Sequence, residues 1–432
     1  MTARLTESSM YAHLWGTQES RAVFDERARL QGWLDVLAAL ARAQAAEGLM
    51  PAAAAATITE LAQVDRLDLD LVAAQTRETG HSTLGLIRAL QQVLPPEVHA
   101  HVYVGATVQD VTDTWTSLAL REVCRLVRRD LVRAEGLILE LALRHRDTVM
   151  AGRTHGQPGA PITFGWKAAS WADELRRQLD RLDEGEPRWL VGQLGGGVGT
   201  LAAHGAAGLA VRHRFCTELG LAEPVTSWLT ARDRVAEVGH VLAMITGTLA
   251  RIGGEVYELQ RAELGELAEP VREGVVGSIT MPHKRNPERS EHLVTLARLV
   301  RAESGVLLEG MTGAHERDGR SWKAEWVALP EVCLLTCTAT QLAVELLTGL
   351  EVNAARMAAN LSDETRSEAA LALLTPRLGK HRAQAALQAA LASPGAGLAT
   401  LLTGDELAAL IPDTGSAGAM VDLVVAHSTA SR

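Results

Sequence analysis

One segment of the chain brings together a hydroxyl, a cation and a carboxamide. Residues 277–287 read Gly-Ser-Ile-Thr-Met-Pro-His-Lys-Arg-Asn-Pro, with Ser278, Lys284 and Asn286 as the groups that could do chemistry. The two prolines forbid a continuous helix, so we predict a loop. Asn286 and Pro287 have the types expected at the N-cap and first position of a following helix. Such a helix end favours negative charge, which suits a carboxylate substrate and an anionic intermediate.

The spacing Gly-Ser-x-x-Met-x-x-Lys-x-Asn resembles the signature loop of the fumarase/aspartase superfamily. That superfamily includes argininosuccinate lyase, adenylosuccinate lyase and 3-carboxy-cis,cis-muconate cycloisomerase. Without this spacing, a glycine-serine lid before an ordinary helix cap would explain the segment. Many members have a second serine where this chain has Ile279. The resemblance implies that Ser278 is the catalytic base and that Met281, Lys284 and Asn286 bind substrate.

A second block of hydroxyl, amide and acidic residues precedes a long predicted helix. It contains Thr107, Gln109 and Asp110. Taken alone, these residues would cap the helix. The resemblance implies instead that they bind the carboxylates of the substrate, although Val108 stands where relatives commonly have serine.

A third block, Arg-Thr-His-Gly-Gln-Pro from Arg153, resembles the histidine block of adenylosuccinate lyase. A lone histidine in a loop is more often structural. The resemblance implies that Thr154 and Gln157 bind substrate and that His155 protonates the leaving group. An imidazole suits that role because its pKa lies near working pH.

Two further residues acquire a role only through the resemblance. His81 lies in a polar break, where a histidine by itself is a helix cap or a surface residue. Arg317 belongs to the run His-Glu-Arg-Asp, which adenylosuccinate lyases share. The resemblance implies that His81 assists or binds the leaving group and that Arg317 binds substrate.

The glycine-rich run Gly-Gln-Leu-Gly-Gly-Gly-Val-Gly at 192–199 does not predict a phosphate site. It lacks the Gly-Lys-Ser/Thr of a phosphate loop and has no strand-turn-helix context. Glycines that let a loop cross between helices explain it.

Composition excludes several other classes of protein. The 432 residues carry a net charge of −10, which argues against a general nucleic-acid binder. The four cysteines include no C-x-x-C pair, so we expect neither a zinc site nor a disulfide framework. No apolar run approaches the ~18–20 residues of a membrane span, and no signal peptide is evident. We therefore expect a cytoplasmic protein without metal or organic cofactor.

The apolar positions repeat at helical spacing, and alternating strand patterns are essentially absent. The sequence predicts an all-α fold with a central bundle of long helices. We expect an N-terminal helical domain at 1–105, a bundle domain at 106–350 and a small helical domain at 351–432. A segment at 265–276, which we interpret as mobile, leads into the signature loop and overlaps the first residues of its range, 274–287. The long helices are expected at 115–147, 232–264, 286–311 and 326–350.

The apolar faces of these helices are too long for one monomer to cover, so we expect burial between subunits. In the superfamily, three subunits of a homotetramer contribute to each active site, and the resemblance implies the same arrangement here. It also implies a small dicarboxylate substrate.

Superfamily members share an anti β-elimination from a succinyl-type substrate, usually with release of fumarate. Removal of a proton beside a carboxylate gives an aci-carboxylate, whose charge needs donors fixed in advance. The preferred hypothesis is a fumarate-releasing lyase that breaks a C–N bond, which His155 and His81 favour. The alternative is a cycloisomerase of the 3-carboxy-cis,cis-muconate type, which overall similarity favours, notably in Arg-Asp-Arg-Val-Ala-Glu at 232–237. A third possibility is a non-catalytic structural protein on the same scaffold, as some lens crystallins are.

Overall fold

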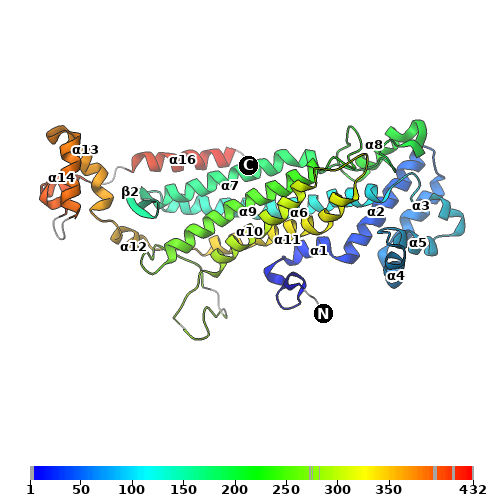
Figure 1. The fold of residues 1–432 in the computed structure, drawn as a ribbon, viewed down its shortest axis with the longest axis horizontal. Helices are drawn as coiled ribbons and strands as arrows, with labels where there is room; N and C mark the ends of the chain where they lie inside the picture. Colours follow the sequence, from blue (N-terminus) through cyan, green and yellow to red (C-terminus); the bar gives the residue numbers. More distant parts are fainter. Residues whose placement is uncertain are drawn as a thin grey trace. The chain divides into compact units, whose positions relative to one another are not determined.

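The computed structural model describes residues 4–271, 274, 276–281, 283–392, 397–410 and 414–430 (Figure 1). Helices dominate it, so the predicted all-α class is confirmed. The helices are α1 (Gln18–Phe24), α2 (Glu26–Ala46), α3 (Ala52–Leu61), α4 (Leu69–Thr79), α5 (Leu84–Val93), α6 (Val108–Arg144), α7 (Phe164–Trp189), α8 (Gly208–Glu218), α9 (Asp233–Gln260), α10 (Glu288–Glu309), α11 (Gly319–Thr348), α12 (Ala354–Ala359), α13 (Ser367–Leu378), α14 (Lys380–Ala392), α15 (Gly404–Ala409) and α16 (Gly415–Ala430). Strand β1 (Val149–Thr154) pairs antiparallel with β2 (Gln157–Thr163), and β3 (Leu267–Ala268) with β4 (Glu351–Val352).

The chain forms two compact units, each built from three separate segments. Unit 1 comprises Met1–Arg129, Asp180–Thr246 and Leu296–Ala339. Unit 2 comprises Asp130–Leu179, Gly247–Thr295 and Thr340–Arg432. Each of the long helices α6, α7, α9, α10 and α11 contributes residues to both units. The three-domain division expected from the sequence stays a prediction.

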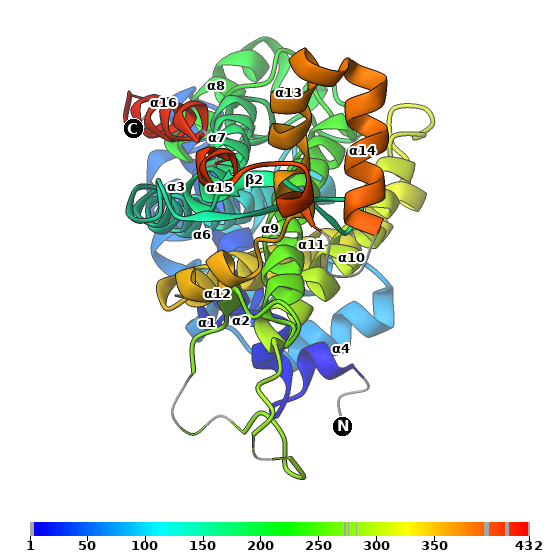
Figure 2. The same ribbon diagram turned by 90° about the vertical axis from the view of Figure 1, so that its left-hand side faces the viewer.

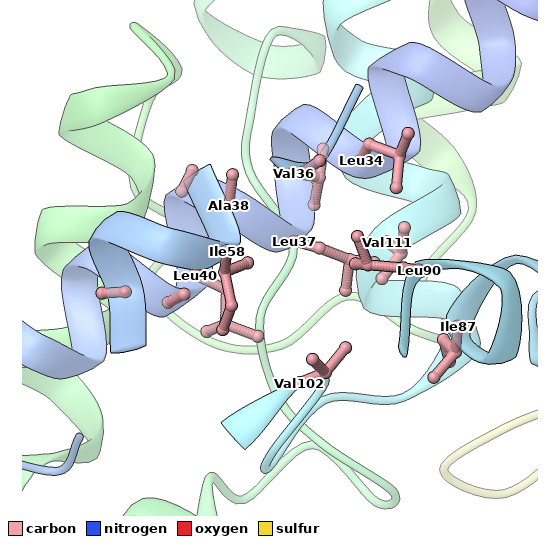
Figure 3. Close-up of a cluster of buried hydrophobic side chains, with 14 of the residues drawn as sticks. Leu34, Val36, Leu37, Ala38, Leu40, Ile58, Ile87, Leu90, Val102 and Val111 are labelled. Atoms are coloured by element: carbon pink, nitrogen blue, oxygen red, sulfur yellow. The ribbon is translucent and has the colours of Figure 1, made fainter. Parts of the chain in front are cut away.

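A continuous apolar core holds the N-terminal helices of unit 1 together (Figure 3). Leu37 of α2 lies beside Leu90 of α5 and Val111 of α6, and Leu34 of α2 and Ile58 of α3 belong to the same cluster. Helix α2 can begin where it does because the Asp25 carboxylate accepts hydrogen bonds from two free N–H groups of its first turn. This core fixes the start of α6, where the second sequence block lies.

Unit 2 carries a helical subdomain and the β1–β2 hairpin. Helices α13 and α14 lie side by side over a small apolar cluster that includes Ala370, Leu374 and Leu387 (Figure 2). The hairpin replaces the loop that the sequence predicted for the third block. Its strands show no alternation of buried and exposed residues, so the period-two signal of a strand was missing. Gly152 sits at a bulge, where a Cβ would lie 2.7 Å from the Ala160 carbonyl oxygen.

Two long helices begin earlier than predicted. Helix α6 begins at Val108 rather than near 115, so Gln109 and Asp110 lie in its first turn. Helix α11 begins at Gly319 rather than near 326, because the Asp318 carboxylate accepts the N–H of Arg320 at 3.0 Å and fixes the first turn. The segment that we interpreted as mobile contains β3, and its mobility stays a prediction. Residues 272, 273 and 275 of that segment, together with Pro282 of the signature loop, lie outside the described residues.

Candidate active site

The second sequence block forms the first turn of α6 in unit 1. The buried Thr107 donates its backbone N–H to Asp110 Oδ2 at 2.9 Å, which is one half of a capping box. The Thr107 hydroxyl accepts a hydrogen bond from the Arg317 guanidinium. Arg317 in turn lies over the Trp322 ring, 5.8 Å from its centroid. Two of the predicted substrate-binding residues, Thr107 and Arg317, are therefore in direct contact.

Asp110 is almost fully buried, and its carboxylate accepts four hydrogen bonds. The backbone N–H groups of Thr107, Gly195 and Gly196 each donate at 2.9 Å, and the Gln193 amide donates at 3.2 Å. Burial raises the pKa of Asp110 to about 6, although these hydrogen bonds act to lower it. The four donors favour the ionised form of this carboxylate. The amides of the glycine-rich run bind an anion that the protein itself supplies.

Gln109 is fully buried and faces an internal ion-pair network. Its Nε2 donates to the Leu229 carbonyl at 2.6 Å and to the Asp113 carboxylate at 3.0 Å. The buried Arg232 guanidinium lies 2.7 Å from that carboxylate and also pairs with Glu325. Desolvated ions of this kind are stable only when paired, so the network fixes α6, α9 and α11 in register.

Gln109 and Asp110 are even more deeply buried than Thr107, at 0% and 1% exposed against 7%. Both are buried, and Asp110 has its oxygens occupied by protein donors. This geometry makes them positioning residues for the Thr107 turn. Direct contact of either residue with substrate stays a prediction.

His81 lies at the exposed start of α5 in unit 1. Its Nδ1 accepts the backbone N–H of Leu84 at 3.1 Å, as a helix cap does. A neutral imidazole with Nδ1 as acceptor carries its proton on Nε2. His81 thus presents an N–H donor to solvent, which suits the binding role predicted for it.

A second histidine of unit 1 was not found by the sequence analysis. His204 is buried, with Nε2 2.9 Å from the Gln44 amide nitrogen, and burial lowers its pKa. Gly105, with φ of 73°, lies against the imidazole ring, where a Cβ would come within 2.5 Å. Gln44 also donates to the Val104 carbonyl at 2.7 Å. His204 therefore supports the turn before Thr107, and its partners lie too far apart in the sequence to form a motif.

The third block places His155 at the tip of the β1–β2 hairpin in unit 2. Thr154 pairs with Gln157, so His155 and Gly156 form a two-residue turn. Both have positive φ, 54° and 77°, as a type I′ turn requires. The four residues of this tip, Thr154, His155, Gly156 and Gln157, are all exposed. The hairpin thus presents Thr154, His155 and Gln157 together to solvent.

An ion pair anchors the base of this hairpin. Arg153 donates two hydrogen bonds to Glu266, at 2.7 and 2.8 Å, and the Glu266 side chain is fully buried. Asn360 donates to the same carboxylate at 2.8 Å. Glu266 lies directly before β3, so the pair fixes the hairpin against the segment that leads to the signature loop.

The signature loop folds back on itself around Ser278. The Ser278 hydroxyl oxygen accepts the backbone N–H of Met281 at 3.0 Å, and a donor there stabilises the ionised form of the hydroxyl. Asn286 Nδ2 donates to the Gly277 carbonyl at 2.8 Å. A Cβ at Gly277 would lie 2.6 Å from the Lys284 carbonyl oxygen, so this closure requires glycine. Ser278, Met281 and Asn286 are therefore gathered in one compact turn.

The helix after the loop is capped differently from the prediction. The N–H groups of Arg289 and Ser290 donate to the buried Glu269 carboxylate, at 3.2 and 2.7 Å. The expected cap, Asn286, uses its amide to close the loop instead. A remote carboxylate can take over because it brings a full negative charge to the positive end of α10. Lys284 is exposed and forms no ion pair with any described residue.

The predicted site residues thus fall into two groups. His81, Thr107, Gln109, Asp110 and Arg317 belong to unit 1, whereas the hairpin tip and the signature loop belong to unit 2. No hydrogen bond or ion pair among the described residues joins His155 to Ser278. No group of three or more His, Cys, Asp or Glu residues in the described part of the chain could hold a metal ion.

Helices α9 and α11 are apolar enough to span a membrane by length and composition, contrary to the expectation that no such run exists. Their most apolar windows are 61% and 67% buried inside the protein, as in core helices.

The helical fold and the serine and histidine blocks together indicate an enzyme of the lyase class. A family model described as "Lyase" matches residues 14–301, and the chain belongs to this family, within the fumarase/aspartase superfamily. The N-acetyl-S-(2-succino)cysteine lyase of Dickeya dadantii is 40% identical over 84% of this chain and 79% of its own. An adenylosuccinate lyase of Methanothermobacter thermautotrophicus is 39% identical over 87% of this chain and 85% of its own.

The fold matches a solved structure along almost its whole length. The 3-carboxy-cis,cis-muconate lactonizing enzyme of Pseudomonas putida superposes with a TM-score of 0.89 and 35% identity, covering 97% of this chain and 98% of its own. The resemblance found from the sequence motifs is therefore confirmed at the level of the family and the fold.

Proposed function

We propose that the protein releases fumarate by anti β-elimination from a succinyl-type dicarboxylate. The observation that carries this proposal is the signature loop, in which Ser278 accepts a backbone N–H and shares one turn with Met281 and Asn286. A serine is too weak an acid to act as base unless its oxyanion is stabilised in a site that excludes water. The Met281 N–H supplies one donor to that oxygen.

The elimination proceeds through a carbanion stabilised as an aci-carboxylate. The Ser278 oxyanion takes the proton from the carbon beside one carboxylate, and the charge spreads onto that carboxylate. The Lys284 ammonium is unpaired within the described residues and provides the cation that this charge requires. The bond between the adjacent carbon and the leaving group then breaks, and fumarate keeps the new double bond.

The departing heteroatom gains a proton from His155. His155 is exposed at the hairpin tip, so its imidazole can contact a substrate that lies outside the core of unit 2. Thr154 and Gln157 beside it supply hydrogen bonds to a substrate carboxylate. Thr107, Arg317 and the Nε2–H of His81 bind the other end of the substrate.

The atom that leaves is nitrogen or sulfur. The sequence motifs favour a C–N bond, as in the adenylosuccinate lyase type of site. The Dickeya relative acts, by its name, on a succinyl group attached to sulfur. A cycloisomerase remains the second candidate, because the lactonizing enzyme matches 97% of this chain.

We also propose that the active enzyme is a cytoplasmic homotetramer with sites shared between three subunits. Helices α9 and α10 carry several partly exposed apolar side chains that an oligomer would cover, namely Met244, Tyr257, Leu299, Val306 and Leu308. Light scattering of the purified protein measures this mass directly.

The test of the function uses the reverse reaction. The enzyme is incubated with fumarate and a panel of amines and thiols, and mass spectrometry detects succinyl adducts. We expect an adduct with wild type and none with Ser278→Ala. If wild type forms no adduct with any member of the panel but lactonises 3-carboxymuconate, the cycloisomerase is the correct function.

A further inference from the structure

A cavity of about 420 Å³ lies within unit 1, among residues of α2, α4, α6 and α11. Its volume is typical of small-molecule sites, and its lining combines apolar and aromatic side chains with charged ones, namely Glu26, Arg29, Arg77, Asp113 and Glu325. Asp113 and Glu325 are paired with Arg232. Part of the lining is aromatic, from Phe24, Trp33, Trp115, Trp322 and Trp326. Four of the nine tryptophans in the whole chain thus surround one cavity.

The rings are held in two groups by edge-to-face contacts. Trp115 meets Phe24 and Trp33 at centroid distances of 6.2 and 6.4 Å, and Trp322 meets Trp326 at 4.7 Å. Gly32 is required for this arrangement, because a Cβ there would lie 2.2 Å from Trp115. Such walls favour a ligand with a flat ring, which can stack on one group and meet the other edge-on.

Three polar groups on the lining residues have no partner within the described structure. They are Arg29 Nε, Trp33 Nε1 and Thr112 Oγ1, all buried. Each can donate a hydrogen bond, and an unpaired buried donor is unfavourable. Arg29 also lies over Trp115 at 5.3 Å, so its charge is held beside the rings. The Arg29 charge therefore favours a ligand that carries an anionic or acceptor oxygen.

The cavity adjoins the substrate-binding residues predicted in the same unit. Ser82 lines it and follows His81 in the chain. Trp322 lines it and lies beneath Arg317, which binds the Thr107 hydroxyl. A ligand held by Thr107 and Arg317 therefore has the cavity next to it.

We propose that this cavity receives the leaving group of the elimination, and that the leaving group is an aromatic thiol or amine bearing a carboxylate or carbonyl oxygen. The identification as a leaving group rests on the proposed function. The reaction is balanced within that function: the ring compound leaves with the electron pair of the broken bond and gains one proton, while Ser278 takes one proton from carbon.

The kinetic test compares matched nucleophiles in the direction of addition to fumarate. The pairs are 3-mercaptobenzoate against 3-mercaptopropionate, and 3-aminobenzoate against β-alanine. We expect wild type to have a KM roughly two- to tenfold lower for the aromatic member of the productive pair, the range of one aromatic contact. Trp326→Leu should remove that preference and leave the aliphatic member unchanged. Trp166→Leu, outside the cavity, is the control.

Binding is measured separately so that the two proposals can fail independently. Calorimetry titrates 3-hydroxybenzoate, which cannot undergo the reaction, into Ser278→Ala and into the double variant with Trp326→Leu. Binding to the first and weaker binding to the second supports the cavity even before a substrate is found. If 3-hydroxybenzoate does not bind, or if aliphatic nucleophiles are preferred while turnover still depends on Ser278, the cavity proposal is wrong and the proposed function stands.

Discussion

His155 adopts a backbone conformation that few side chains tolerate. Its φ is 54°, and together with Gly156 it makes the turn that asparagine followed by glycine fits best. A non-glycine residue in this region is strained by roughly 1 kcal/mol or more. Since the imidazole is exposed and contributes no packing, stability does not explain its presence. A task outside the hairpin, such as the proposed protonation of the leaving group, would explain its position at the tip.

Replacing His155 with Asn separates these two contributions. We expect kcat to fall by roughly 10²- to 10⁴-fold, the usual value of a general acid, because the proton donor is lost. The melting temperature should stay the same or rise, since asparagine suits the turn. His315, also exposed and with φ of 56°, gives a matched control: His315→Asn should leave kcat unchanged. An active His155→Asn enzyme would remove this residue from the mechanism.

His204 predicts a pH dependence of stability. Burial lowers the pKa of His204 in the folded state below the ordinary histidine value of about 6.5. Below pH 6.5 the unfolded chain therefore binds a proton that the folded protein resists, so this contribution to stability is complete above pH 6.5 and is lost as the pH falls. The slope from one group is at most about 1.4 kcal/mol per pH unit. Melting temperatures between pH 5 and 8 should fall less steeply for His204→Asn than for wild type, and parallel curves would contradict the assignment.

At the scale of elements, the buried acids Glu266 and Glu269 hold the two segments of unit 2 that carry candidate site residues. Glu266 anchors the hairpin through Arg153, and Glu269 caps α10 at the end of the signature loop. Both flank β3, so one short strand carries the supports of both segments. A change in β3 would thus move the hairpin and the loop together.

Glu269→Ala tests the cap of α10. It leaves the N–H groups of Arg289 and Ser290 without a partner, so we expect a loss of about 1–3 kcal/mol in the free energy of unfolding. The value of kcat/KM should also fall, because the loop loses its fixed end. Glu288→Ala, an exposed acid in the same first turn, should change stability by less than about 1 kcal/mol. If the two variants lower the free energy of unfolding in urea equally, Glu269 does not stabilise α10 as a cap.

The sequence predicted the long helices because their apolar positions repeat over many turns. It missed the hairpin, whose strands do not alternate, and it began α11 too late. It also singled out candidate site residues, since those stand in local motifs, and their roles stay predictions. Positioning residues such as Glu266 were missed, because Arg153 lies 113 residues away and no local pattern connects them. Long-range partners become visible only once the chain is folded.

For the whole molecule, the central question is whether one chain completes a site. His155 and Ser278 both belong to unit 2, yet no hydrogen bond or ion pair joins the hairpin tip to the loop within the described residues. Exposed apolar side chains on α9 and α10 point to association between chains. Both features are expected if the tip of one subunit meets the loop of another.

Mixing two inactive variants tests this arrangement directly. His155→Asn and Ser278→Ala subunits are unfolded, combined and refolded, so that mixed oligomers form. If His155 and Ser278 of a site come from different subunits, some sites pair the intact histidine of one variant with the intact serine of the other, and activity returns. If one chain supplies both residues, every site keeps one defect and the mixture stays inactive. Each variant refolded alone is the control, and light scattering confirms that the mixed oligomers have the mass of the wild type.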